Sequence, residues 1–375
     1  MKVALELQPV CGKRSGIGTY TYELAKRMKN EDWLEFQGNL FNFLKRNNND
    51  DALSGITMPI NENSLLPYGV YRRVWHALPI PYKYMFPQHA DLSVFFNYIV
   101  PPRINGHVIT TIHDMTYLRF PETMERKNLQ RIEKDIQYSV ERSDRIITVS
   151  EFSKREIIEL LDVPEKKIAV IPNAPTFSKG KVDFAALSEK FHIASPYLLY
   201  VGTIEPRKNL VRLIRAFDCL KRKYGIPHQL VLAGGKGWVY EEIYETAASV
   251  AASRDIRFIG YVSQSEKNTL YQNASAFVFP SLYEGFGIPP LEAMQFRCPV
   301  VCADAASLPE VVGDAAQMVD PLDEESIADG IWRVISDEEY AESLIQKGEI
   351  RKELFNWDDS ARRLAELCKS VLGEI

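Results

Sequence analysis

The chain has few cysteines and no long apolar run. Its cysteines are odd in number and scattered: Cys11, Cys219, Cys298, Cys302 and Cys368. No second cysteine or histidine pair lies near Cys298 and Cys302 to complete a zinc site, so reduced thiols in a cytosolic protein are expected. No apolar stretch approaches the ~20 residues that span a bilayer, and the apolar run at the start is too short for a signal peptide. We therefore expect a cytoplasmic protein whose membrane contact, if any, is peripheral.

The chain also lacks an excess of positive charge. Its 45 lysines and arginines are outnumbered by 50 acidic residues, which gives a net charge of −5 and a pI near 5.8. This balance argues against a molecule that binds nucleic acid over its whole surface. The 375 residues are 46% hydrophobic and 25% charged, as in ordinary soluble proteins, and suffice for two domains.

Short apolar runs alternate with amphipathic segments along the chain, which predicts parallel sheets covered by helices on both faces. The strands expected in the first half are 2–7, 107–114, 144–150 and 167–173, and those in the second half are 197–202, 229–234, 256–260, 276–280 and 299–303. The helices expected between them include 19–29, 126–143, 151–161, 209–224 and 265–274.

The rhythm breaks once, at residues 176–195, which follow Pro175, hold Gly180 and show little strand character. We interpret this stretch as a linker between two doubly wound α/β domains, residues 1–175 and 196–354. Ligands of open α/β sheets bind beyond the carboxyl ends of the strands, so a cleft between the two domains is the expected site.

Two turns that follow expected strands are suited to binding an anion. "CGKRSGIGTY" holds Gly16 ahead of a helix expected from Thr19, but it matches neither the dinucleotide nor the Walker glycine pattern. "YVGTIEPRKNL" ends a strand at Gly202 and places Arg207 and Lys208 before a helix, where two cations suit a diphosphate. The alternatives are a tight turn without a ligand in the first case and a solvated Arg-Lys pair in the second.

Two further strand ends carry candidate residues. His113, in "TIHDMTY", could donate a hydrogen bond to a sugar hydroxyl or a developing charge, or it could be a structural histidine. Lys236, in "AGGKGW", could add a phosphate contact, or the segment could be a plain turn.

The segment "SLYEGFGIPPLEAM" carries two glutamates, Glu284 and Glu292, with seven residues between them. Its first residues form the turn after an expected strand, and a helix is expected from Pro290 with Glu292 in its first turn. The backbone amides of residues 286–288 would then face the cleft between the two carboxylates. Two carboxylates held apart can accept hydrogen bonds from two polyol groups of one ligand, such as a nucleotide sugar.

Five elements in order resemble the retaining family-4 (group 1) glycosyltransferases, which have the GT-B fold of two Rossmann-like domains facing a cleft. They are the glycine loop, the strand end at His113, "TVSEFSK", "EPRKN" and the E-x7-E segment of Glu284 and Glu292. The resemblance covers the whole chain and implies that residues 355–375 form a helix that crosses back to the first domain. It implies a nucleotide-sugar donor, a saccharide or lipid-linked acceptor, no cofactor and no metal.

The resemblance also implies a role for each residue of a donor site. Arg207 and Lys208 would hold the diphosphate, Glu292 the ribose, and Glu284 the transferred sugar. Catalytic residues would then be His113, Arg207, Lys208 and Glu284, and donor-binding residues Gly16, Gly202, Arg207, Lys208, Val262, Glu284, Phe286, Gly287, Ile288 and Glu292. Gly16 would close the phosphate site, Val262 would lie near the base, and the leaving phosphate would take the proton of the acceptor.

The motifs most resemble those of bacterial mannosyltransferases that use GDP-mannose in surface polysaccharide synthesis. A rhamnosyl- or glucosyltransferase with a dTDP- or UDP-sugar, a sugar-nucleotide epimerase and a non-catalytic sugar-binding protein stay open as alternatives. Residues 68–87 hold six aromatic and three basic residues and no acidic one. They could contact an anionic membrane surface, form a helix with a buried aromatic face, or line a groove for the acceptor.

Overall fold

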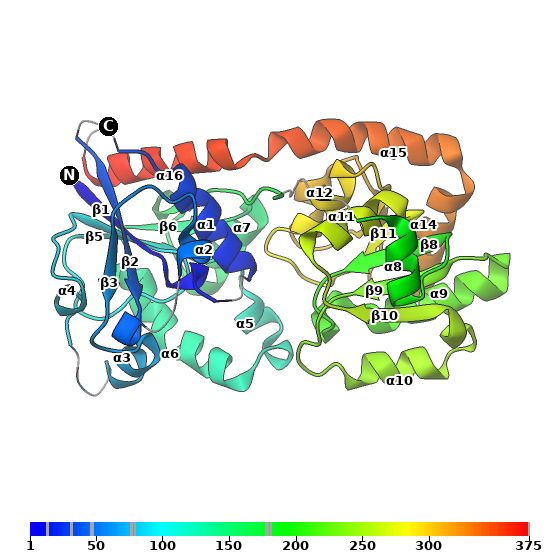
Figure 1. Ribbon diagram of the computed structural model, residues 1–375, viewed down its shortest axis with the longest axis horizontal. Helices are drawn as coiled ribbons and strands as arrows, with labels where there is room; N and C mark the ends of the chain where they lie inside the picture. Colours follow the sequence, from blue (N-terminus) through cyan, green and yellow to red (C-terminus); the bar gives the residue numbers. More distant parts are fainter. Residues whose placement is uncertain are drawn as a thin grey trace. The chain divides into compact units, whose positions relative to one another are not determined.

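The computed structural model describes residues 1–375 except 13–14, 31–32, 46–48, 76–77, 79, 177–179, 181 and 374–375. It forms two compact units. Unit 1 consists of Met1–Met115, Arg126–Asn173 and Asn356–Ile375. Unit 2 consists of Thr116–Glu125 and Ala174–Phe355 (Figure 1). The chain thus enters unit 2 twice, since the short segment Thr116–Glu125 groups with unit 2 although it lies inside the range 1–175.

Unit 1 is built on a parallel sheet in the order β3-β2-β1-β4-β5-β6-β7. Its strands are β1 (Lys2–Glu6), β2 (Glu35–Phe41), β3 (Ile60–Asn63), β4 (Leu92–Phe95), β5 (His107–Thr111), β6 (Arg145–Thr148) and β7 (Ile168–Val170). Strands β2, β3 and β4 were not among the expected elements. They carry polar residues such as Asn39 and Ser93 in place of a continuous apolar run.

Seven α-helices of unit 1 lie in its described residues. They are α1 (Gly16–Arg27), α2 (Asp50–Leu53), α3 (Tyr68–Val74), α4 (Tyr82–Met85), α6 (Arg126–Arg142), α7 (Glu151–Leu161) and α16 (Trp357–Val371). Helix α1 begins at Gly16 and not at Thr19, because the Ser15 hydroxyl accepts a hydrogen bond from the Gly18 amide and caps the helix. Helix α16 packs beside α1, and Ser360 donates a hydrogen bond to the carbonyl of Pro172 (Figure 1).

Unit 2 has a second parallel sheet, in the order β10-β9-β8-β11-β12-β13. Its strands are β8 (Tyr197–Val201), β9 (Gln229–Ala233), β10 (Ile256–Gly260), β11 (Ala276–Phe279), β12 (Val300–Ala303) and β13 (Gln317–Val319). Strands β8, β9, β11 and β12 are buried along their whole length, as strands covered by helices on both faces require. Two doubly wound parallel sheets confirm the predicted fold class.

The helices of unit 2 include one in the stretch that was expected to be a linker. Those of unit 2 are α5 (Thr116–Arg119), α8 (Phe184–Phe191), α9 (Leu210–Tyr224), α10 (Glu241–Ser249), α11 (Gln264–Asn273), α12 (Ile288–Gln295), α13 (Leu308–Val312), α14 (Glu324–Ser336) and α15 (Glu338–Arg351). Helix α8 lies in the stretch 176–195 and packs on unit 2, where the ring of Phe184 stacks on Tyr197 with centroids 6.0 Å apart.

The start of α12 differs from the prediction. The helix begins at Ile288, two residues before Pro290, because Gly287 adopts a left-handed conformation at the N-cap (φ 102°) and the two prolines fill early helical positions that need no N–H partner. Glu292 is therefore the fifth residue of the helix, at the start of its second turn, and lies two residues further into the helix than predicted.

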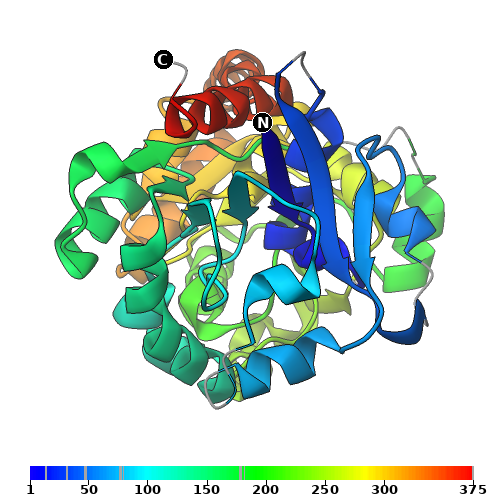
Figure 2. The same ribbon diagram turned by 90° about the vertical axis from the view of Figure 1, so that its left-hand side faces the viewer.

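Helices α3 and α4 form the cover of one part of the unit 1 sheet. Figure 2 shows α4, in cyan, in front of the sheet and next to α3. Four rings of this segment, those of Tyr71, Trp75, Tyr82 and Phe86, are buried in one apolar cluster. The segment is thus two short helices with a largely buried aromatic face, while its residues 76, 77 and 79 lie outside the described ones.

Among the helices that the structure describes, none has the length and apolar character needed to cross a membrane.

Candidate active site

The cationic turn of unit 2 lies at the carboxyl end of β8. Pro206–Lys208 form one turn of 3₁₀ helix, and Asn209 follows in a left-handed conformation (φ 62°) before α9 begins. The side-chain amide of Asn209 donates hydrogen bonds to the carbonyls of Pro280 (3.0 Å) and Pro321 (2.6 Å). This buried amide ties the turn to the end of β11, so the sequence "PRKN" brings its two cations to the segment that carries Glu284.

Four charged side chains meet at that place. The Lys208 ammonium donates to Glu284 Oε1 at 2.5 Å, and the Arg207 guanidinium donates to Glu284 Oε2 at 3.1 Å. Arg207 also donates to Glu205 Oε1 (2.8 Å) and to the carbonyl of Tyr283 (2.6 Å). All four side chains are at most 15% exposed. The structure thus places both predicted cations in direct contact with the first glutamate, Glu284.

Electrostatics fix the charge of this cluster. Burial acts to raise the pKa of the Glu284 carboxyl, but the charges of Lys208 and Arg207 outweigh it and lower that pKa to about 2. Burial lowers the pKa of the Lys208 ammonium, Arg207 acts in the same direction, and Glu284 and Glu205 oppose the shift. Glu284 is thus firmly anionic, and an anionic ligand placed here would strengthen the protonated form of Lys208.

The glycine turn after Glu284 is held from beneath by Ser307. Its hydroxyl oxygen is 2.8 Å from the carbonyl of Glu284 and 2.9 Å from that of Phe286. Both carbonyls thereby face Ser307. A larger residue at position 287 would be strained by the positive φ, and its Cβ would lie 2.5 Å from a methyl carbon of Leu308, which would have to shift. The turn and the N-terminus of α12, formed by residues 286–288, are consequently well defined.

The second glutamate has partners of its own. Glu292 is buried, and its Oε1 accepts a hydrogen bond from Lys267 Nζ at 2.6 Å. Its Oε2 accepts one from the Tyr271 hydroxyl at 3.2 Å. Both partners come from α11. The structure thus gives the two carboxylates different surroundings, with Glu284 held by the cationic turn and Glu292 by a neighbouring helix.

Two other predicted residues of unit 2 also follow strands. Gly202 comes directly after β8, and an added Cβ there would lie 2.5 Å from the Tyr200 hydroxyl, which donates to the Thr203 carbonyl. The fold alone thus favours glycine at this position. Val262 follows β10 and is buried. Both residues lie past the carboxyl ends of their strands, where the ligands of open α/β sheets bind.

The predicted residues of unit 1 also lie past strand ends. Gly16 is the exposed first residue of α1, and an added Cβ would meet nothing within 4 Å, so packing does not demand glycine there. His113 follows β5 and is buried, with its Nε2 2.9 Å from the Phe96 carbonyl. Burial lowers the pKa of His113, which favours a neutral ring whose Nε2–H donates to that carbonyl. Lys13 and Arg14 of the glycine loop lie outside the described residues.

Sequence reasoning missed four residues that shape this site: Glu205, Lys267, Tyr271 and Ser307. Glu205 stands two residues before Arg207, a spacing that could have predicted an ion pair within the turn. Lys267 and Tyr271 are four residues apart on one helix, so they share a face. Nothing in the sequence pairs that face with Glu292, and nothing near Ser307 indicates the turn that it supports.

The sequence matches two family models. Residues 186–351 match the model described as glycosyl transferases group 1, and residues 53–174 match that of glycosyltransferase family 4. The O-antigen chain mannosyltransferase B of Escherichia coli is 30% identical over 378 residues, which cover 96% of this chain and 97% of that protein. The O-antigen chain mannosyltransferase RfbU of Salmonella typhimurium is 32% identical over 60% of each chain.

Solved structures show the same architecture. A sucrose-phosphate synthase from Thermosynechococcus elongatus superposes with a TM-score of 0.75 at 18% identity and full coverage of both chains. Anabaena HepE, solved in complex with UDP and glucose, superposes with a TM-score of 0.73 at 17% identity, covering 99% of this chain and all of that one. The E. coli relative matches this chain across nearly its whole length, and the solved structures share its architecture. The chain therefore belongs to the group 1, family-4 glycosyltransferases and has the GT-B fold.

Proposed function

We propose that this glycosyltransferase transfers mannose from GDP-mannose to a saccharide or lipid-linked saccharide acceptor in bacterial surface polysaccharide synthesis. The names of the two O-antigen mannosyltransferases support mannose and the pathway. The observation that carries the proposal is the buried cluster of Arg207, Lys208, Glu205 and Glu284 at the carboxyl ends of β8 and β11.

The cluster can perform the two tasks that a leaving diphosphate and its sugar require. The Lys208 ammonium has three N–H donors and uses one for Glu284. Arg207 binds the same carboxylate, so both cations can face the oxygens of a diphosphate. As the bond to the anomeric carbon breaks, negative charge grows on the phosphate, and these cations stabilise it. Glu284, kept ionised, accepts hydrogen bonds from sugar hydroxyls. Glu292 does so from the ribose.

The reaction we propose retains the configuration of the anomeric carbon and uses no metal. The leaving phosphate takes the proton of the acceptor hydroxyl on the same face, so Glu284 acts as a binding group and not as a nucleophile. Because the Nε2–H of His113 is used by the Phe96 carbonyl, His113 accepts a hydrogen bond from a sugar hydroxyl at Nδ1. Val262 lies near the base through its main chain. NMR of the product decides the configuration, and an assay with and without a chelator decides the metal requirement.

A donor panel tests the function. Purified protein is incubated with GDP-mannose, UDP-glucose or dTDP-rhamnose, each labelled in the sugar, together with a manno-oligosaccharide. We expect label in the oligosaccharide from GDP-mannose alone. Transfer from UDP-glucose or dTDP-rhamnose would show that the transferred sugar is glucose or rhamnose and not mannose. A changed configuration at C2 without transfer would indicate an epimerase, and retention of intact donor a sugar-binding protein.

We also propose that the protein is cytoplasmic and meets anionic lipid through residues 68–87. Arg73 and Lys83 are exposed there, and exposed apolar side chains accompany them at Val70, Leu78 and Tyr84. Each cation near an anionic surface contributes about 1 kcal/mol, which salt screens. We expect the protein to sediment with anionic vesicles at low salt, and Arg72→Glu with Arg73→Glu to abolish it. A wild-type protein that never sediments with such vesicles contradicts the proposal.

A further inference from the structure

A cavity in unit 1 lies on one face of the sheet, beside the amino ends of β4 and β5. Its volume is about 390 Å³, within the range of small-molecule sites. It is lined by α4 and its continuation to Ala90, by Asn39 of β2 and Ser93 of β4, and by the residues just before β5. His89 and Asn105 precede the amino ends of β4 and β5, whereas His113 follows the carboxyl end of β5.

The cavity exists because one face of the sheet carries polar and small side chains and is incompletely covered. In the parallel register Ala4 pairs with Gln37 and Ser93, and Glu6 pairs with Asn39, so these residues share a face. Of these residues, Asn39 and the small Ser93 line the cavity. Helix α4 spans only Tyr82–Met85 and cannot cover it.

One buried polar group on this face lacks a partner among the described residues. The Gln37 amide nitrogen is buried and has no hydrogen-bond partner in the part of the chain that the structure describes. Buried parallel sheets are normally lined by aliphatic side chains, and buried polar groups are normally paired. Gln37 does not itself line the cavity, but its unpaired donor lies on the same face of the sheet as the lining residues Asn39 and Ser93, so this face is more polar than a closed core requires.

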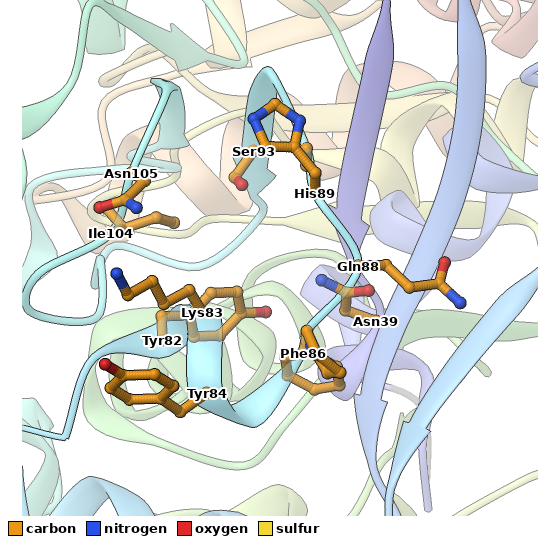
Figure 3. A pocket seen from close by; sticks show the side chains of 12 residues that line it. Asn39, Tyr82, Lys83, Tyr84, Phe86, Gln88, His89, Ser93, Ile104 and Asn105 are labelled. Atoms are coloured by element: carbon orange, nitrogen blue, oxygen red, sulfur yellow. The ribbon is translucent and has the colours of Figure 1, made fainter.

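The side chains around the cavity match the chemistry of a saccharide. Asn39, Gln88 and Asn105 bring amides, which both donate and accept hydrogen bonds as sugar hydroxyls require. Figure 3 shows the Tyr82 hydroxyl directed towards Asn39, with which it shares a hydrogen bond, and shows Asn105 and Lys83 on the other side. The Tyr84 ring is 63% exposed and offers an apolar face to the C–H groups of a pyranose.

We infer that this cavity is a second saccharide-binding site, which holds the part of the polysaccharide acceptor already built while transfer occurs elsewhere. Asn39 and Asn105 bind hydroxyl groups, Tyr84 stacks on a sugar ring, and Lys83 adds a donor at the rim. The inference rests on the proposed function for the nature of the saccharide, but binding at the cavity requires no catalysis. An acceptor held in this way gains affinity with each sugar that reaches the cavity.

Direct binding of oligosaccharides tests the inference in the absence of donor. α-Linked mannotriose, rhamnose trisaccharide and maltotriose are titrated into the full-length protein, with ligand-observed NMR as readout. We expect at least one to bind with an affinity that salt leaves unchanged. Tyr84→Ala should weaken binding about tenfold through loss of the stacked ring, and Tyr84→Phe should restore it. Leu65→Ala removes an exposed apolar side chain of unit 1 outside the cavity and should leave binding unchanged.

Four results would overturn the inference: no binding of any trisaccharide, equal binding by wild type and Tyr84→Ala, binding that falls steeply with salt, or a Tyr84-dependent affinity for vesicles alone. A transfer assay separates this failure from that of the proposed function. If the chain transfers mannose but the cavity binds no saccharide, only the inference fails. If trisaccharide binds through Tyr84 while no sugar nucleotide supports transfer, only the proposed function fails. In an active enzyme, Tyr84→Ala should raise the KM of a long acceptor and leave the kcat unchanged.

Discussion

At the scale of single residues, the pair of Lys208 and Glu284 distinguishes this site from an ordinary strand end. Their charged atoms are 2.5 Å apart and both side chains are buried. Removing one partner of such a pair leaves the other charge uncompensated. Arg207 lies within 3.1 Å of the same carboxylate and limits that penalty. A cation can therefore be removed here while the fold survives.

We predict that Lys208→Ala lowers turnover about 10- to 100-fold in a folded protein. The variant loses a charged hydrogen bond to the leaving diphosphate, worth about 1.5–3 kcal/mol. The measurement is the kcat with the best donor, beside circular dichroism. Lys190→Ala is the matched control, because Lys190 belongs to the same unit and pairs with Glu266 at the surface. Normal turnover in folded Lys208→Ala would contradict the role of the cluster.

The two glutamates should differ in what they bind. We predict that Glu292→Gln weakens binding of free GDP, whereas Glu284→Gln preserves it and slows sugar transfer about 10- to 100-fold. The reason is that the ribose does not react and the transferred sugar does. Glutamine keeps the size of both side chains, so Lys208 and Lys267 stay close to a hydrogen-bond acceptor. Calorimetric titration of GDP decides the matter, and an equal loss of GDP affinity in both variants would refute the distinction.

At the scale of elements, the turn between β11 and α12 depends on one glycine. We predict that Gly287→Ala destabilises the protein by about 1–3 kcal/mol, because alanine is strained at a positive φ and its Cβ would meet Leu308. Gly225→Ala is the control, since Gly225 has φ +61° with nothing within 4 Å of an added Cβ. Urea unfolding should show the larger loss at Gly287. Equal losses of unfolding free energy in the two variants would show that the contact with Leu308 contributes nothing.

The elements also show how far the sequence could predict the structure. Continuous apolar runs predicted strands such as β8 and β11 well, and the motif around Arg207 and Glu284 indicated which strand ends carry the charged cluster. Strand β2 was not predicted because its polar residues Gln37 and Asn39 interrupt the apolar run. The predicted start of α12 was two residues too late because the left-handed conformation of Gly287 at the N-cap was not considered. Long-range partners such as Ser307 could not be predicted, since only the fold brings them to the turn.

At the scale of the whole molecule, each unit has its own sheet and buried core, so calorimetry should resolve two unfolding transitions. Helix α16 is the last element of the chain yet packs in unit 1, where Trp357 is buried against Tyr20. We predict that Trp357→Ala lowers the stability of unit 1 by about 3–5 kcal/mol. The other transition is assigned to unit 2 because GDP should raise its midpoint temperature. In Trp357→Ala this midpoint temperature should not change. A variant in which both transitions shift alike would show that the units do not unfold separately.

The proposed function depends most directly on the identity of the sugar donor. The most direct measurement incubates wild type, Lys208→Ala and Lys190→Ala with GDP-mannose labelled in the sugar and a manno-oligosaccharide, and follows label in the oligosaccharide together with GDP released. We predict stoichiometric transfer and release by wild type and Lys190→Ala, and about 10- to 100-fold slower transfer by Lys208→Ala. Absence of transfer from GDP-mannose by a folded wild-type protein that uses another sugar nucleotide, or equal rates in all three proteins, would contradict the account.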